Sequence, residues 1–300
     1  MSITKLLYLE NFTLLECEAK VIAVENENGR DILILDQTCF YPQGGGQPYD
    51  KGIIESNSGK FIVEETRFVD GAVRHIGSFE KGAFKQGDTV ACKVEKDRRE
   101  LNSRLHSAGH LVDMALATIK PDWIPGKGYH FPDGPYVEYQ GTLDPVESEK
   151  LSAIDGFASG GKTALAIAIE ERANRIISDG CNVKIVFADK KEMAKLCRFV
   201  PDYIPEGKPG RVVRFGEFGV PCGGTHVSNL SEINPTAPQA MRHQGGFVLR
   251  GLGSAEQLQN PSIPPVSGQV LGDKIKSMTI RKIKPEREII RIGYDVTREK

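Results

Sequence analysis

The chain has 300 residues, 39% of them hydrophobic, and its 39 basic and 40 acidic side chains leave a formal net charge of −1 at pH 7. A chain of this length and composition is typical of an ordinary globular protein with two domains or one large one. The near-zero charge excludes a basic field over the whole molecule, so any contact with nucleic acid must come from a local patch.

The cysteines and the N-terminus indicate a reducing compartment. The six cysteines are irregularly spaced and form no CxxC pair, which is not the pattern of a disulfide framework. The apolar run at the N-terminus is short, is interrupted by Glu10 and has no small-residue cleavage site, and no stretch is long enough to span a bilayer. We expect a cytoplasmic protein without membrane contact, and no obligate protein partner is evident.

Short alternating apolar segments separated by glycines fill residues 17–94. Many short strands without a helical period predict a small antiparallel β-barrel or sandwich, and we assign residues 1–95 to this first domain. The expected strands are residues 18–24, 31–35, 52–54, 60–63, 72–76 and 89–94.

A glycine-rich block, Tyr41-Pro-Gln-Gly-Gly-Gly-Gln-Pro48, interrupts these strands. Its three adjacent glycines, Gly44, Gly45 and Gly46, permit positive φ angles and the close approach of another backbone or a ligand. On composition alone, a tight surface turn is the ordinary explanation of such a triplet.

Residues 97–119 are expected to form a long helix carrying half of a metal site. His106 and His110 lie one helical turn apart, so both imidazoles can reach a single ion. Two partly buried histidines satisfied by hydrogen bonds are the alternative. Ser107 occupies the position of the glutamate base of an HExxH zinc peptidase, which excludes that class. The apolar stripe that predicts the helix consists of Leu101, Leu105, Ala108, Val112, Ala115 and Ile119.

The segments that follow mix strands and helices without a regular βαβ repeat, which predicts an α+β fold for residues 96–300. His130 could approach a metal, although a lone histidine in a loop usually has no such role. We expect a loop at 126–131 and a strand at 136–139 that carries Glu138. A helix that ends at Gly180 is expected next, and its core face consists of Leu165, Ile169, Ala173 and Ile176. A strand at 183–187, a short helix at 190–199 and a strand at 211–218 are expected to follow.

Residues 156–163, GFASGGKT, match the phosphate-binding pattern GxxxxGK[ST]. A phosphate loop requires a buried strand directly before it, whereas residues 147–155 are charged and have the pattern of a helix start. Nucleotide binding through Lys162 is therefore an alternative that the local context disfavours.

A second half of a metal site lies in Pro221-Cys-Gly-Gly-Thr-His226. A thiolate and an imidazole four residues apart, with two glycines between them, suit a tetrahedral zinc ion with nitrogen and sulfur ligands. Together with the helix pair, the sequence predicts a zinc site formed by His106, His110, Cys222 and His226.

Residues 234–275 are rich in proline and glycine and have no sustained period, so we expect an irregular insertion in the second domain. Two strands at 277–283 and 288–296 are expected to follow as a hairpin. Its cations form a candidate strip for phosphate contacts, and a solvated surface is the alternative: Lys274, Lys276, Arg281, Lys282, Lys284 and Arg291.

Three blocks of this sequence resemble a known family. The segments Arg104-Leu-His-Ser-Ala-Gly-His-Leu111 and Cys222-Gly-Gly-Thr-His-Val227 are similar to the signature of the editing domain shared by alanyl- and threonyl-tRNA synthetases. The block at 35–48 resembles the glycine-rich loop of alanyl-tRNA synthetases and of the free-standing AlaX trans-editing proteins. The resemblance covers about residues 11–232 and resumes near residue 277, and the insertion between them departs from the family.

The resemblance implies a zinc-dependent hydrolase that acts in trans on alanine tRNA mischarged with serine or glycine. It also implies that the glycine-rich loop faces the editing site of the second domain. Thr38, Gln43 and Gln47 are the candidate catalytic and amino-acid-reading residues, and Gly44, Gly45, Gly46 and Glu138 are the candidate substrate-binding residues. No amino-acid-activating core is visible, so aminoacylation is not expected. A non-catalytic, zinc-stabilised RNA-binding module is the main alternative.

Overall fold

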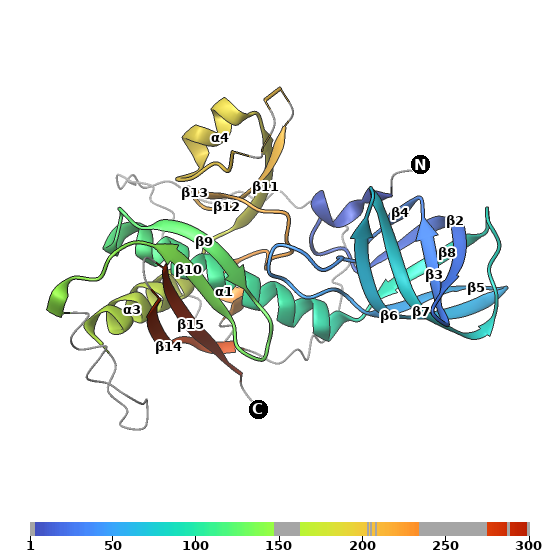
Figure 1. Ribbon diagram of the computed structural model, residues 1–300, viewed down its shortest axis with the longest axis horizontal. Coiled ribbons are helices and arrows are strands. Elements are labelled where there is room, and N and C mark those ends of the chain that lie inside the picture. The colour runs from blue at the N-terminus through green and yellow to red at the C-terminus, as the bar shows by residue number, and fades with distance from the viewer. Residues whose placement is uncertain are drawn as a thin grey trace, which may run out of the picture.

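The computed structural model describes residues 4–146, 163–202, 204, 206–207, 209–233, 275–286 and 289–298. A β-barrel and an α+β part lie at opposite ends of the molecule, and helix α1 (Lys96–Ile119) runs from one into the other (Figure 1). The predicted α+β class with an N-terminal antiparallel barrel is confirmed.

The barrel is closed and antiparallel, with strand order β2-β3-β7-β6-β5-β8. Each of the six expected strands is present, and most are longer than the apolar alternation alone predicted. Asn28-Gly29 and Asp70-Gly71 form the tight turns of two hairpins, since all four residues have the positive φ angles that such turns require. The strands are β2 (Glu16–Glu27), β3 (Arg30–Leu35), β5 (Gly52–Ser56), β6 (Gly59–Val69), β7 (Ala72–Gly82) and β8 (Thr89–Val94).

A short parallel pair joins the N-terminus to the start of the glycine-rich block. Strand β1 (Lys5–Leu6) pairs with β4 (Gln37–Thr38), and the 3-10 helix η1 (Leu7–Leu9) follows β1. The glycine-rich block leaves the barrel between β4 and β5.

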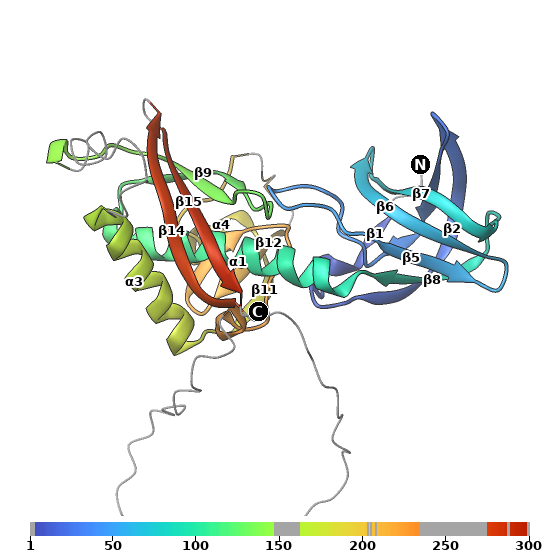
Figure 2. The same ribbon diagram turned by 90° about the horizontal axis from the view of Figure 1, so that it is seen from below.

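Helices α1 and α3 (Ala164–Asp179) cover one face of a four-stranded sheet of order β14-β15-β10-β9 (Figure 2). Apolar side chains of both helices and of that sheet face form one core, as the predicted stripes of the two helices require. The strands are β9 (Ile124–Tyr129), β10 (Tyr136–Gln140), β14 (Ile275–Glu286) and β15 (Ile289–Arg298). The predicted C-terminal hairpin is thus confirmed.

A second, three-stranded sheet delivers the downstream metal-site segment. It consists of β11 (Val183–Ala188), β12 (Gly210–Phe215) and β13 (Phe218–Pro221), with the short helix α4 (Lys190–Leu196) beside it. The single strand predicted at 211–218 was wrong: the chain reverses at Gly216, whose φ is 62°, and forms the β12–β13 hairpin. Cys222 follows the end of β13 directly.

The loop predicted at 126–131 was also wrong, because most of it is strand β9. Gly126 and Gly128 lower the β propensity of this segment, since glycine is depleted in strands. The sequence pattern alone therefore does not indicate a strand here. At Gly128 a close approach requires glycine, because a Cβ there would overlap the ring of His130.

Two predicted features, residues 156–162 of the phosphate-loop-like segment and the insertion at 234–274, lie outside the described residues. Thr163 caps helix α3 by accepting a hydrogen bond from the Ala166 N–H, and the 3-10 helix η3 (Leu230–Ile233) follows the downstream metal-site segment. Within the described ranges, no helix combines the length and apolar character needed to cross a bilayer.

A buried ion pair fixes the start of α1 on the barrel. Arg99 is 2% exposed, and its Nε lies 2.9 Å from Oδ2 of the fully buried Asp50. The same guanidinium donates to the carbonyls of Cys39, Phe12 and Leu14. One side chain therefore ties the helix to the glycine-rich block and to the segment that leads into β2.

We expect Arg99→Ala to destabilise the protein by about 3–5 kcal/mol, because it leaves the Asp50 carboxylate buried without its cation. Arg99→Lys should recover little, since an ammonium lacks the planar fork that serves several acceptors at once. The free energy of unfolding in urea, measured for both variants, gives the two effects. Lys96→Ala is the control, because its ion pair with Glu100 is partly exposed and should be worth at most about 1 kcal/mol. Equal effects at the two positions would contradict the role given to Arg99.

Candidate metal centre

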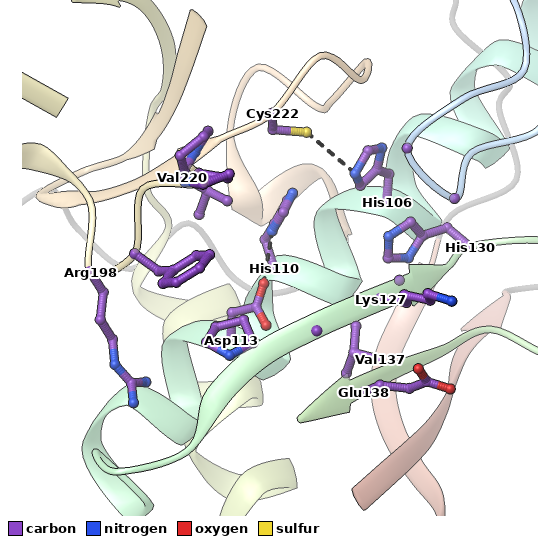
Figure 3. Close-up of a pocket in the computed structure, with 18 of the residues that line it drawn as sticks. His106, His110, Asp113, Lys127, His130, Val137, Glu138, Arg198, Val220 and Cys222 are labelled. Atoms are coloured by element: carbon purple, nitrogen blue, oxygen red, sulfur yellow. Dashed lines mark hydrogen bonds and ion pairs between the residues drawn. The ribbon is translucent and has the colours of Figure 1, made fainter. Parts of the chain in front are cut away.

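The four predicted zinc ligands converge. His106 and His110 project from α1, and Cys222 approaches from the segment after β13 (Figure 3). His226 belongs to the same segment. One donor atom from each residue lies within 4.8 Å of the other three. The Cys222 Sγ lies 3.4 Å from Nε2 of both His106 and His226. Zinc–nitrogen and zinc–sulfur bond lengths place tetrahedral ligands roughly 3.3–3.8 Å apart, so these two distances fit such an ion.

Each imidazole is held by a hydrogen bond at its Nδ1, so that its Nε2 faces the other donor atoms of the cluster. The His106 Nδ1 lies 2.8 Å from Gln47 Oε1, and the His110 Nδ1 lies 2.9 Å from Asp113 Oδ2. The His226 Nδ1 lies 3.3 Å from the Ser107 hydroxyl. Acceptors at Nδ1 select the tautomer whose Nε2 carries a lone pair, which is the arrangement found behind metal-bound histidines.

One buried atom points specifically to a ligand. The Nε2 of His110 is buried and has no hydrogen-bond partner among the described residues. An imidazole nitrogen left in this state costs free energy that a metal bond would recover. Zinc therefore fits the donor set, the spacing and the unpaired nitrogen.

The electrostatics of the cluster favour the ligand-competent forms of His106, His226 and Cys222, whereas His110 holds a proton. Burial, followed by repulsion from neighbouring histidines, holds the pKa of His106 and that of His226 well below the ordinary value, so both rings are neutral. Burial raises the pKa of Cys222, but His110, the Gly224 N–H and Arg211 outweigh it and lower the pKa overall. In His110 the effect of burial is outweighed by Asp113 and Cys222, which raise its pKa to about 10. A metal ion would displace that proton on binding.

The glycine-rich block reaches this cluster from the barrel, as the resemblance implied. Gln47 is fully buried, and its Oε1 accepts hydrogen bonds from His106 and from the Thr225 N–H, at 2.8 and 3.0 Å. Its amide nitrogen donates to the Thr225 hydroxyl at 2.8 Å. Gly46, with φ of 75°, lies so close to the β9 backbone that a Cβ there would overlap the Gly128 carbonyl.

A cavity of about 600 Å³ opens beside the cluster. Three of the four candidate ligands line it, namely His106, His110 and Cys222, whereas His226 does not. Figure 3 shows these ligands at one end of the hollow and Lys127, Val137 and Glu138 of β9 and β10 along one side. Further parts of the wall come from Gly45, Gly46, Arg198 and Phe199.

The other predicted site residues differ in whether they line the cavity. Glu138 lines the cavity and accepts a hydrogen bond from Arg291 at 2.8 Å. Thr38 is fully buried; its hydroxyl accepts from the Phe40 N–H at 3.0 Å and lies 2.9 Å from Nε2 of His75. Gln43 is exposed. Among the described residues, the predicted site residues Thr38, Gln43, Gly44 and Gln47 are not part of the cavity wall, so their catalytic and substrate-binding roles stay predictions.

Two residues that support the cluster were not singled out from the sequence as its supports. Asp113 holds His110 and in turn accepts a hydrogen bond from the Tyr139 hydroxyl. Its position three residues after His110 on the same helix is a signal that could have found it. His130, which was considered only as a lone loop histidine, stacks on His106 with ring centroids 4.4 Å apart. The structure places it next to the ligands but outside the set of four.

Comparisons with known proteins find relatives of the kind that the sequence blocks resemble. Residues 6–98 match the family model described as tRNA synthetases class II (A). The alanyl-tRNA editing protein AlaX-L of Pyrococcus horikoshii is 28% identical over 230 residues, which cover 75% of this chain and 52% of that protein. The alanine–tRNA ligase of Archaeoglobus fulgidus is 32% identical over 233 residues, covering 77% of this chain and 23% of the ligase. Alanine–tRNA ligase 1 of Lachnoclostridium phytofermentans is 33% identical over 209 residues, covering 67% and 21%.

The chain thus spans about half the length of AlaX-L and about a quarter or less of these ligases.

We expect Gly224→Ala to abolish or greatly weaken metal binding, because a Cβ at this position would overlap the His106 ring. Its neighbour Gly223 is the matched control, since a Cβ there meets nothing within 4 Å. Metal content after dialysis against excess zinc and then against metal-free buffer measures the difference. Full zinc content in Gly224→Ala, with a folded protein, would contradict the assigned ligand geometry.

Proposed function

We propose that this chain, a homologue of the alanyl-tRNA editing protein AlaX-L and a member of the alanyl-tRNA synthetase editing-domain family, is a zinc-dependent aminoacyl-tRNA deacylase. Its substrate would be alanine tRNA that carries serine, and glycine is the second candidate. The observation that supports this most strongly is the convergence of three imidazoles and one thiol at the end of a cavity that the glycine-rich block helps to line.

The chemistry needed is modest. The ester that joins an amino acid to the terminal adenosine is already activated, so an oriented water and stabilisation of the oxyanion suffice. When bound, zinc supplies Lewis acidity or lowers the pKa of a water molecule. The chain itself would hold the ligands, shape the cavity and orient the ester.

Four protein ligands would fill all the coordination positions of a tetrahedral ion, whereas catalytic zinc usually keeps one position open. Of the two ligands that could give way to substrate or water, Cys222 lines the cavity and is partly exposed, while His226 is buried and lies outside the cavity wall. We therefore assign the substrate-facing side of the site to Cys222, together with His106 and His110. If no ligand gives way, the ion instead orders the pocket and positions the substrate.

Other parts of the cavity suit a nucleoside ester. Its volume of about 600 Å³ lies in the usual range for small-ligand sites. Gly45 and Gly46 have no side chain, so their backbone itself forms part of the cavity wall. Glu138, also in the wall, is held in place by a hydrogen bond from Arg291. Gln47 acts as a positioning residue in this proposal, because its amide is committed to His106 and Thr225.

The deciding experiment is the release of serine from Ser-tRNA(Ala) by the wild type and by Cys222→Ala, with metal content measured on both. We expect the wild type to release serine and Cys222→Ala to be slower by a factor on the order of 100 or more, since a site that stabilises the transition state is disrupted. Cys181→Ala is the control for loss of a partly exposed thiol elsewhere. A wild type that holds stoichiometric zinc and binds the tRNA without releasing serine would establish the non-catalytic alternative.

Selection of serine over alanine supplies a second prediction. A buried polar group left unpaired by alanine would disfavour the correct substrate, and Thr38 is the first candidate for that group. We expect Thr38→Val to reduce the preference for Ser-tRNA(Ala) over Ala-tRNA(Ala) by roughly tenfold or more. Thr66→Val removes another fully buried hydroxyl near the same block and serves as the control. An unchanged preference would show that Thr38 does not read the amino acid.

A further inference from the structure

The cavity beside the metal cluster has an apolar wall that the proposed function does not use. The wall consists of four side chains: Phe199, Pro201, Phe218 and Val220. Figure 3 shows Val220 on one side of the hollow and Lys127 and Val137 on the other. An apolar and partly aromatic wall, with polar groups confined to other parts of the cavity, is typical of a site that holds a flat, apolar part of a ligand.

Phe199 is the most open residue of this wall. Its side chain is 48% exposed, although it lines a cavity. It belongs to none of the apolar cores, and within the described parts of the chain no other aromatic ring or guanidinium stacks on it. A phenylalanine ring in contact with water is unfavourable by an amount that a ligand covering the ring would recover.

The segment that follows α4 is fixed on two sides. Cys197 forms a β-bridge with Gly219 of β13, and a Cβ at Gly219 would overlap the last carbonyl of α4, so glycine permits this contact. The guanidinium of Arg198 donates to the carbonyls of Pro121 and Trp123, in the connection between α1 and β9. The apolar wall is therefore held in position relative to β9 without a ligand, which lowers the entropic cost of binding one.

Phe199 lies away from the candidate metal ligands. Figure 3 shows Arg198 at the end of the hollow opposite His106 and Cys222, and Phe199 is the next residue of the chain. A nucleoside ester whose reacting carbonyl lies at the ligands would extend its base toward that end. Proteins commonly hold an unpaired base by stacking it on an aromatic side chain.

We propose that Phe199 forms the subsite for the terminal base of the RNA, which stacks on its ring inside the cavity. This inference rests on the proposed function, since it takes the ester to lie at the candidate ligands. It adds the residue that holds the base. Because every base has a π-face, such a subsite recognises a flat ring and does not depend on hydrogen bonds to the base.

The first test is the kinetics of serine release from Ser-tRNA(Ala). We expect Phe199→Ala to raise KM by roughly tenfold, because one base–aromatic stack is lost. The value of kcat and the metal content should change little, since the interaction is made equally in the ground state and the transition state. Phe199→Tyr keeps the ring and should resemble the wild type. Phe199→Leu keeps apolar bulk without a ring and should resemble Phe199→Ala.

Phe187→Ala is the matched control. Phe187 is 51% exposed, belongs to β11 and does not line the cavity, so its loss should leave KM unchanged. Neither phenylalanine is part of an apolar core, so truncation creates no internal cavity. The unfolding temperature of each variant verifies the fold.

The second test detects stacking directly and requires no hydrolysis. The probe is an RNA hairpin with a single-stranded 3′ end whose last base is 2-aminopurine, a fluorescent adenine analogue that loses emission when it stacks on another ring. We expect the wild type and Phe199→Tyr to quench the probe on binding. Phe199→Ala and Phe199→Leu should lose most of that quenching at saturating protein concentration.

Equal KM values for the wild type and Phe199→Ala would overturn the inference, and so would a raised KM with unchanged quenching. If Phe199→Leu matches Phe199→Tyr, apolar contact suffices and stacking is wrong. If the wild type releases serine and neither KM nor quenching depends on Phe199, this inference fails and the proposed function stands. If quenching depends on Phe199 and no serine is released, the base subsite stands and the hydrolase proposal fails.

Discussion

The arrangement depends on the two ring nitrogens of His106. Its Nδ1 is held by Gln47 from the barrel side, and its Nε2 faces the thiol of Cys222 from the second part of the chain. Because one amide of Gln47 also fixes the Thr225 N–H and hydroxyl, the glycine-rich block positions both halves of the cluster. The segment between β4 and β5 is therefore part of the candidate metal site, although it contributes none of the four candidate ligands.

Glycine at a few positions makes this convergence sterically possible. A Cβ at Gly224 would overlap the His106 ring, and a Cβ at Gly109 or Gly128 would overlap the ring of His130. Four imidazoles can share so small a volume only because the backbone comes within van der Waals distance of their edges. The three imidazoles of the candidate ligand set are buried, and low exposure to water strengthens the electrostatic interactions among them.

Local patterns in the sequence predicted the elements that short-range physics determines. The apolar stripe of α1, the alternating strands of the barrel and the four-residue spacings of the ligand pairs are all visible within short stretches of sequence. Strand β9 was missed because Gly128 is required by a neighbour that the local pattern does not reveal. The β12–β13 hairpin was missed at a local turn, where Gly216 has a φ of 62°. The role of Gln47 as the partner of His106 is likewise not visible in the sequence, because the two residues are 59 positions apart.

Strand β10 shows how one short segment connects several parts of the proposed function. Tyr139 holds Asp113, which holds His110, so the inner face of the strand orients a metal ligand through two hydrogen bonds. Glu138, on the opposite face, lines the cavity. Since the side-chain period of a strand is two, a shift of one residue in its pairing would remove both of these side chains from their places at once. The register of β10 against β15, which aligns Glu138 with Arg291, is therefore a constraint on the proposed function as well as on the fold.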